Sequence, residues 1–199
     1  KLWIDALVSA DVLNKGCTTV AYSYIGPELS HAIYRDGTIG QAKKDLEATA
    51  RVLNEQLKKS VDGEAYVSVN KGLVTRSSAV IPIISLYLSV LFKVMKEKGL
   101  HEGCIEQMER LFAERLYTGE NNSKGKIPCD SENRIRIDDW EMSEDVQSEV
   151  ASLMSGVTQE NLAERCDLEG YKHDFLNING FDVEGVDYSK DITDMSSLD

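Results

Sequence analysis

Two residues of this chain, Tyr34 and Lys43, have side chains that together can hold and transfer a proton. A phenol ordinarily titrates near pH ~10, so a lone tyrosine is a poor proton donor or relay at neutral pH. A nearby ammonium group favours the phenolate and lowers the pKa of the phenol. A tyrosine–lysine pair is therefore suited to supplying a proton to a developing enolate or alkoxide.

The spacing between Tyr34 and Lys43 decides how the two side chains can meet. Nine positions along an ideal helix make about 2.5 turns, which would place the side chains on opposite faces. The pair can cooperate only if Tyr34 precedes a helix that contains Lys43 in its first turns. An Asp-Gly turn signal and Thr38, an acceptable N-cap, follow Tyr34, so we expect a helix over residues 39–58. Spacing alone favours a plainer alternative, a half-buried tyrosine and a solvated lysine, because no general motif has this spacing.

Composition limits the class of protein. The 199 residues are enough for one ordinary domain, and 42% hydrophobic and 28% charged residues fit a soluble globular protein. The net charge of -12 argues against a surface for nucleic acid or anionic membranes. The longest apolar run, residues 79–94, is shorter than the ~20 residues of a membrane span. We expect a buried helix over residues 79–98, with Pro82 in its first turn and Ser77 or Ser78 as its cap.

Cysteine and histidine spacing gives little sign of a metal or disulfide framework. Cys17, Cys104, Cys129 and Cys166 have no short paired spacing. Free cysteines and the lack of an export signal favour a reducing compartment, with the cytoplasm as the default, although a processed organellar protein would look the same. His101 and Cys104 have no partner set, so we expect no metal site. We expect the acidic run at residues 138–141 to be a solvated loop rather than a cation site.

The order of the expected elements indicates a parallel α/β fold. We expect helices at residues 3–13, 39–58, 79–98, 101–117, 143–154 and 158–165, and strands at 18–24, 65–70 and 134–137. Residues 118–132 are expected to form a surface loop and residues 189–199 a loose acidic tail. Ligands of such sheets lie beyond the carboxyl ends of the strands, which points to residues 24–34 and 71–75. Either segment could equally be an ordinary strand-to-helix loop, which is the commoner case for an isolated Gly-x-x-Thr.

Long, collinear segments of the chain resemble the trans-2-enoyl-CoA reductases, a family that includes the FabV-type enoyl-[acyl-carrier-protein] reductases. The segments are residues 21–50, 67–99, 101–117, 132–147 and 170–191. The family is similar to the short-chain dehydrogenases in fold, but eight residues rather than three separate its tyrosine from its lysine. Tyr34 and Lys43 have that longer spacing. The resemblance implies the C-terminal half of a Rossmann-like doubly wound parallel sheet, with additional helices over the substrate site.

The resemblance implies NADH-dependent reduction of the C2–C3 double bond of an enoyl-CoA or enoyl-acyl-carrier-protein thioester. Tyr34 would be the proton relay, and Lys43 would hold the nicotinamide ribose. Tyr24 would contact the substrate near the thioester, and Tyr171 either faces the substrate or packs in the core. The remaining expected contacts to the cofactor are Leu73, Val74 and Thr75.

One departure from the family concerns nucleotide binding. The chain has no G-x-G-x-x-G segment, so a glycine-rich N-terminal half expected of such a fold is missing from residues 1–199. Three explanations stay open: a fragment of an enzyme, one of two subunits that share a site, or a truncated relative retained for binding or structure. The first two are enzyme halves, and the third is a catalytically silent scaffold. The presence of both Tyr34 and Lys43 favours the enzyme halves.

Overall fold

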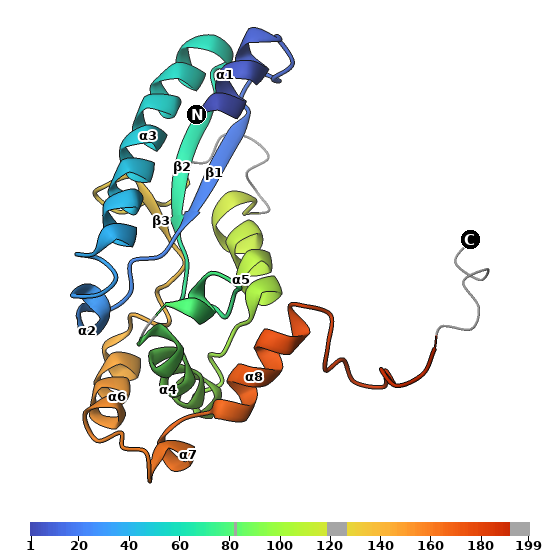
Figure 1. The fold of residues 1–199 in the computed structure, drawn as a ribbon. Coiled ribbons are helices and arrows are strands. Elements are labelled where there is room, and N and C mark those ends of the chain that lie inside the picture. Colours follow the sequence, from blue (N-terminus) through green and yellow to red (C-terminus); the bar gives the residue numbers. More distant parts are fainter. Residues whose placement is uncertain (82, 119–126, 192–199) are drawn as a thin grey trace.

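Three parallel strands form the single sheet of the computed structural model, which describes residues 1–81, 83–118 and 127–191 (Figure 1). The strands are β1 (Thr18–Ser23), β2 (Glu64–Val69) and β3 (Arg134–Arg136), in the order β1-β2-β3. Thr18 pairs with Glu64, and Val67 pairs with Arg134. The predicted parallel α/β fold is confirmed, and all three expected strands are present within one residue of their predicted ends.

Helices cover both faces of the sheet (Figure 1). On one face α3 (Thr38–Val61) packs Leu53 and Leu57 against Ala65 of β2. On the other face α5 (Cys104–Leu111) packs Leu111 against Tyr66, the next residue of β2. Adjacent residues of a strand point to opposite faces, which is why β2, buried on both sides from Ala65 to Val69, serves two helices.

A second group of helices lies beyond the carboxyl ends of the strands (Figure 1). Its members are α4 (Ile84–Glu97), α6 (Glu144–Ser155), α7 (Leu162–Arg165) and α8 (Leu168–Asn177). The central helix α4 is buried over most of its length, and α6 and α8 pack against it. Burial on most sides explains why α4 is apolar almost all round. No helix within the described residues is long and apolar enough to span a membrane.

The helix predicted over residues 79–98 begins later than expected. A 3-10 turn at Ser78–Val80 precedes it, and α4 itself starts at Ile84. Ser78 does not cap the helix, because its hydroxyl bonds back to the carbonyl oxygens of Leu73 and Thr75. The prediction for Pro82 lies outside the described residues. The extra turn shapes a loop between β2 and α4 rather than lengthening the helix.

The start of α3 also differs from the prediction. Gly37, in an extended conformation, is the N-cap, and Thr38 is the first helical residue. A Cβ atom at Gly37 would lie 2.5 Å from the carbonyl oxygen of Ile33, so the close approach of the backbone favours glycine there. The chain reaches this turn through α2 (Glu28–His31), a short helix that the sequence pattern did not reveal.

Several other ends were predicted too long or lie outside the structure. Helix α1 (Leu2–Ser9) ends four residues before the predicted end at position 13. Helix α5 passes into a π-helical turn at Phe112–Leu116. Of the helix predicted over residues 158–165, only the last turn forms, as α7. Residues 119–126 of the predicted loop and 192–199 of the predicted tail are not described. Residues 189–191 of that tail are exposed.

Candidate functional site

A cavity of about 210 Å³ opens where β1 and β2 end and the loop before α4 begins. Its position beyond the carboxyl ends of parallel strands is the usual place for a ligand in such sheets. The lining combines apolar side chains with a few polar ones, as small-molecule sites do. The polar lining residues are Tyr22, Ser23, Tyr24, Tyr34, Lys43, Asn70, Lys71, Thr75, Ser77 and Ser78.

Tyr34 and Lys43 both line this cavity, as predicted, one before α3 and the other inside it. Tyr34 lies in the turn between α2 and α3, where its backbone is held at both ends. Its N–H donates to the carbonyl oxygen of Ser30 at 2.9 Å, and its carbonyl oxygen accepts from the N–H of Gly40 at 3.0 Å. The two side chains form no hydrogen bond with each other among the described contacts, so any cooperation passes through the cavity.

Burial sets the proton affinity of both side chains. Tyr34 is only 6% exposed, and burial raises the pKa of its hydroxyl above the ordinary value. Burial also lowers the pKa of the Lys43 ammonium. The sequence-based expectation that lysine lowers the pKa of this phenol is therefore wrong for Tyr34 in this structure. The raised pKa keeps Tyr34 protonated at neutral pH, so its hydroxyl has a proton to donate.

Ser23, at the end of β1, is a cavity residue that the sequence reasoning missed. Its side chain is buried, and its hydroxyl oxygen has no hydrogen-bond partner among the described residues. Buried polar groups without partners are rare and often mark a functional position. The alternation of β1 was the available signal, because it places Ser23 on the same side of the strand as other inward-facing residues.

Tyr24, by contrast, is fully engaged. Its hydroxyl donates to Oε1 of Glu141 at 3.0 Å, and its ring lies edge-on to the ring of Tyr34, with the centroids 5.2 Å apart. Two glycines make room for the hydroxyl. A Cβ atom would lie 2.7 Å from it at Gly26 and 3.4 Å from it at Gly72. The Tyr24 hydroxyl therefore occupies a position that backbone and carboxylate fix together.

Lys71 lines the inner wall of the cavity as a buried cation, 2% exposed. Its ammonium donates to the carbonyl oxygens of Gly72 at 3.1 Å and Glu102 at 2.8 Å, and lies 4.9 Å from the centroid of the Phe92 ring. Burial lowers the pKa of Lys71 to about 8, although the carboxylates of Glu141 and Glu102 act in the opposite direction. Lys71 thus helps to fix the loop that follows β2.

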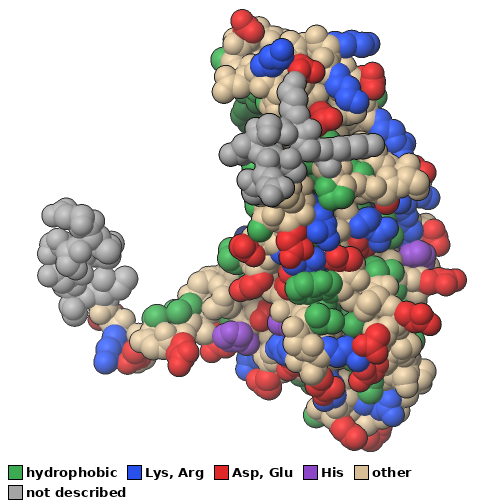
Figure 2. All heavy atoms as spheres, turned by 180° about the vertical axis from the view of Figure 1, so that it is seen from behind, with side chains coloured by type: hydrophobic (Ala, Val, Ile, Leu, Met, Phe, Trp, Pro, Cys, Tyr) green, Lys and Arg blue, Asp and Glu red, His purple; other side chains and the backbone are tan. Residues whose placement is uncertain are grey.

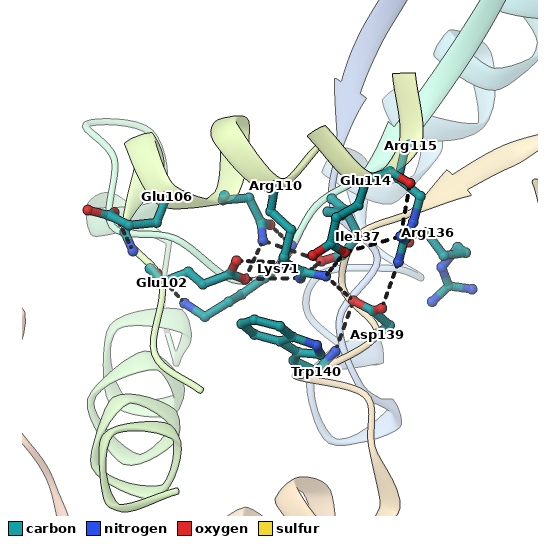
Figure 3. A network of polar contacts seen from close by, with 12 residues as sticks. Lys71, Glu102, Glu106, Arg110, Glu114, Arg115, Arg136, Ile137, Asp139 and Trp140 are labelled. Atoms are coloured by element: carbon teal, nitrogen blue, oxygen red, sulfur yellow. Dashed lines mark hydrogen bonds and ion pairs between the residues drawn. The ribbon is translucent and has the colours of Figure 1, made fainter. Parts of the chain in front are cut away.

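The Glu102 carboxylate pairs with the guanidinium of Arg110 (Figure 3). Arg110 donates to both Glu102 oxygens, at 2.6 and 3.0 Å, and to Asp139 at 2.9 Å. The guanidinium also lies 4.0 Å from the centroid of the Trp140 ring. Because Arg110 balances Glu102, Glu141 is the other buried carboxylate near Lys71.

The remaining predicted residues divide between the cavity and its surroundings. Leu73 and Thr75 line the cavity, whereas Val74 is buried and lines a neighbouring cavity of about 370 Å³ that includes His101 and Cys104. Tyr171 lies on α8, where its hydroxyl donates to Ser85 at 3.1 Å. It is not among the residues that line the first cavity.

The acidic run at residues 138–141 is not the solvated loop that we expected. Asp138 is buried and pairs with Arg136, while Asp139 pairs with Arg110 and Arg115. Glu141 is completely buried. Within the described residues no group of three or more His, Cys, Asp or Glu side chains is placed to hold a metal ion. The run joins β3 to the rest of the fold, which no local sequence signal indicated.

Two family models match the chain. One, described as the trans-2-enoyl-CoA reductase catalytic region, matches residues 1–117, and the other, described as an enoyl reductase FAD binding domain, matches residues 129–192. The trans-2-enoyl-CoA reductase [NADH] of Treponema denticola is 61% identical over 190 residues, which is 96% of this chain and 46% of that protein. The enoyl-[acyl-carrier-protein] reductase [NADH] of Cytophaga hutchinsonii is 57% identical over 198 residues, 100% of this chain and 48% of that protein.

Solved structures give the same picture. The trans-2-enoyl-CoA reductase of Clostridium acetobutulicum in complex with NADH superposes with a TM-score of 0.90 at 50% identity, covering 96% of this chain and 47% of that one. The Treponema denticola reductase in complex with NAD gives a TM-score of 0.87 at 61% identity, with 96% and 46% covered. The chain spans about half the length of the curated relatives it matches.

Proposed function

Because the chain belongs to the trans-2-enoyl-CoA reductase family, we propose that it forms the proton-donating and substrate-binding part of an NADH-dependent enoyl-thioester reductase. The reaction saturates the C2–C3 double bond of a trans-2-enoyl thioester carried by CoA or by acyl-carrier protein. The observation behind this proposal is the meeting of Tyr34, Lys43 and Ser23 in one cavity at the ends of β1 and β2.

Two of these side chains fit the nicotinamide ribose of NADH. Ser23 has a buried hydroxyl without a partner, and Lys43 has an ammonium without an ion-pair partner among the described residues. Polar groups in such surroundings are stabilised by a hydrogen-bonding ligand, and ribose hydroxyls supply both donors and acceptors. NADH, when bound, supplies the hydride that is added at C3 of the substrate.

Tyr34 is the proton donor of the proposed reaction. Addition of hydride at C3 leaves negative charge on the thioester oxygen and C2, and a positioned donor stabilises that charge. The buried Tyr34 hydroxyl keeps its proton at neutral pH because burial raises its pKa. Lys43 supports proton transfer by holding positive charge in the same cavity.

Residues around the pair define the rest of the proposed site. Leu73 and Thr75 are proposed contacts to the nicotinamide end, because both line the cavity beside Lys43. Val74 supports that loop from the core side. Tyr24 is the proposed contact to the substrate near the thioester. Tyr171 is proposed to support the substrate side of the site indirectly, through its hydrogen bond to Ser85 and its packing against Phe92.

FAD does not fit the segment whose family model carries its name. Residues 129–192 contain 17 Asp and Glu but only five Lys and Arg, so the segment offers few cations to a diphosphate. Acidic side chains are spread over the lobe of helices beyond the sheet (Figure 2). Four of the five cations bond to carboxylates, and Arg165 donates to the carbonyl oxygen of Leu153. We therefore derive no flavin step.

Exposed apolar groups favour an enzyme half over a self-contained scaffold. On α1, Leu2 is 85% and Trp3 is 81% exposed, and within the described part of the chain β1 has a strand on one side only. Uncovered apolar side chains beside an open strand edge are typical of surfaces that pack against another part of a protein. We propose that the portion of the relatives' length that this chain does not span completes the site.

The decisive experiment is an assay of NADH oxidation with crotonyl-CoA. The chain is tested alone and then mixed with the N-terminal half of a relative, and the same pair is tested with crotonyl-acyl-carrier protein. We expect turnover in the mixture. If the two halves fold and bind NADH and the enoyl thioester but oxidise no NADH, the enzyme proposal is replaced by that of a catalytically silent scaffold. The two substrates separate the CoA and acyl-carrier-protein forms, which share the reacting thioester.

A further inference from the structure

Glu141 is a completely buried carboxylate that accepts hydrogen bonds from three different parts of the chain. Oε1 accepts from the Tyr24 hydroxyl at 3.0 Å and from the Tyr87 hydroxyl at 2.6 Å. Oε2 accepts from the backbone N–H of Gly72 at 2.6 Å. The end of β1, the loop after β2 and helix α4 therefore meet at a single side chain.

The hydrogen-bond partners fix where each proton lies. An ionised carboxylate only accepts, and a backbone N–H only donates. The Nε2 group of Gln147 donates to the Tyr87 hydroxyl at 3.1 Å and to the carbonyl oxygen of Glu141 at 2.7 Å. The carbonyl oxygen can only accept, which fixes this amide group as the donor, so Tyr87 accepts from Gln147 and gives its own proton to Glu141. Tyr24 likewise has one proton, and it points to Oε1.

Three hydrogen-bond donors and a neighbouring cation favour the ionised form of Glu141. Burial has the larger effect and raises the pKa of Glu141 above its ordinary value, while the buried Lys71 ammonium and the three donors act in the opposite direction. Two further carboxylates act on Lys71: Glu102, which is bound at both oxygens by Arg110, and Asp174, which lies 3.6 Å from His101. The remaining titratable groups that face Glu141 are the hydroxyls of Tyr24 and Tyr87.

We propose that Glu141 is a positioning residue that directs the Tyr24 proton away from the cavity, so that Tyr24 presents an acceptor oxygen to the substrate. This inference rests on the proposed function, and it gives the two cavity tyrosines opposite tasks. A thioester carbonyl oxygen accepts hydrogen bonds but cannot donate one. Tyr34 therefore donates to the reacting thioester, and Tyr24 accepts from a substrate N–H, such as an amide of the carrier arm that CoA and acyl-carrier protein share.

Substitution of Glu141→Gln tests the direction of the Tyr24 proton. The N–H of Gly72 requires an acceptor, so the amide oxygen must take the position of Oε2. The amide nitrogen then faces Tyr24 and Tyr87 and donates to both, which frees the Tyr24 proton. Glu64→Gln is the matched control, because Glu64 accepts from the Tyr66 hydroxyl at 2.8 Å and does not line the cavity.

The first readout is independent of activity. In the chain labelled with ¹³C at tyrosine Cζ, the resonances are assigned with Tyr24→Phe and Tyr87→Phe variants. We expect Glu141→Gln to shift the Tyr24 and Tyr87 resonances, and Glu64→Gln to shift that of Tyr66 alone. An unmoved Tyr24 resonance in Glu141→Gln would overturn the proposal. If Glu141→Gln does not fold, Tyr87→Phe replaces it. Removing the competing donor must then strengthen donation by Tyr24 and move its resonance.

The second readout is kinetic and uses the chain together with the N-terminal half of a relative. We expect Glu141→Gln to raise KM for the enoyl thioester about 10–100-fold, the range typical of partners that orient a primary ligand. In the Tyr24→Phe background the same substitution should change KM less than about twofold, because the oriented hydroxyl is gone. Equal effects in both backgrounds would refute the positioning role. If the wild-type pair reduces no enoyl thioester, the proposed function fails, while the resonances still decide the role of Glu141.

Discussion

The two sides of the cavity differ in how their polar groups are satisfied. On one side Tyr24 and Gly72 both donate to Glu141, so the carboxylate has a donor at each oxygen. On the other side Ser23 has no partner, and Lys43 has no ion pair among the described residues. Fully bonded groups are rigid and position their neighbours, whereas unsatisfied groups favour a ligand. On the first side the chain itself satisfies the polar groups, and on the second side the polar groups are left for a ligand to satisfy.

The largest expected effect concerns Tyr34, which should matter for chemistry and little for folding. Tyr34→Phe removes the proposed proton donor and should lower kcat by about 10²–10⁴-fold, the usual contribution of a positioned acid. Its ring still packs against Tyr24, so the melting temperature should stay close to that of the wild type. Turnover is measured with crotonyl-CoA and the complementary half, and Tyr66→Phe is the control. Unchanged kcat in Tyr34→Phe would show that the donor lies elsewhere.

Lys43 should affect cofactor affinity. Lys43→Met should weaken NADH binding about 10–100-fold, because a hydrogen bond to a charged group contributes roughly 1.5–3 kcal/mol. Burial lowers the pKa of Lys43, so in the wild type this contact should weaken as the pH rises through that lowered value. Lys43→Arg should keep its charge there. Titration of NADH binding against pH measures both effects. The control is Lys58→Met, because Lys58 is an exposed lysine of the same helix. Normal affinity in Lys43→Met would refute the ribose contact.

Lys71 should reveal itself in stability rather than in cofactor binding. Its pKa is lowered to about 8, so above that pH the unfolded chain binds more protons than the folded one. By linkage, the contribution of Lys71 to the free energy of unfolding grows between pH 8 and the ordinary lysine pKa, and is lost as the pH falls through 8. Urea unfolding should show wild type gaining about 1–3 kcal/mol relative to Lys71→Met over this window. Parallel pH profiles of the two proteins would contradict the assignment.

The smallest effect is expected at Ser23, where function and stability should move in opposite directions. Ser23→Ala removes a buried hydroxyl without a partner, so the free energy of unfolding should stay equal or rise slightly. NADH affinity should fall about 3–10-fold, the equivalent of one neutral hydrogen bond of roughly 0.5–1.5 kcal/mol. Chemical unfolding and NADH titration together make the test. A loss of stability without a loss of affinity would show that Ser23 belongs to the satisfied side of the site.

The regular elements were predictable because their signals are local. The β-branched and aromatic residues of β1 and β2 and the period of α3 indicated a parallel α/β sheet, and the structure has one. The helix start near Ile84 was missed because the side chain of Ser78, an apparent cap, bonds to the preceding loop instead. Helix α2 was missed because four residues give no measurable period.

The sequence predicted those site residues whose side-chain type alone suggests a role, and it missed those whose role depends on tertiary contacts. The Tyr34–Lys43 pair, Leu73 and Thr75 reach the same cavity, as the strand ends required. Glu141 was read as part of a solvated loop, because its partner Tyr24 lies 117 residues away along the chain. The alternation of β1 indicated only that Ser23 faces inward, since a hydroxyl in a strand becomes notable only when its surroundings leave it without a partner.

The sequence by itself determined the order of strands and helices and the acidic net charge. It also showed that a tyrosine just before a helix and a lysine within that helix can come close together. Only the tertiary structure decided the direction of their pKa shifts. Burial raises the pKa of Tyr34, where the sequence predicted that Lys43 would lower it. The physical reason is that helix and strand patterns arise from neighbours along the chain. Desolvation and the hydrogen bonds of Glu141 arise from segments that only folding brings together.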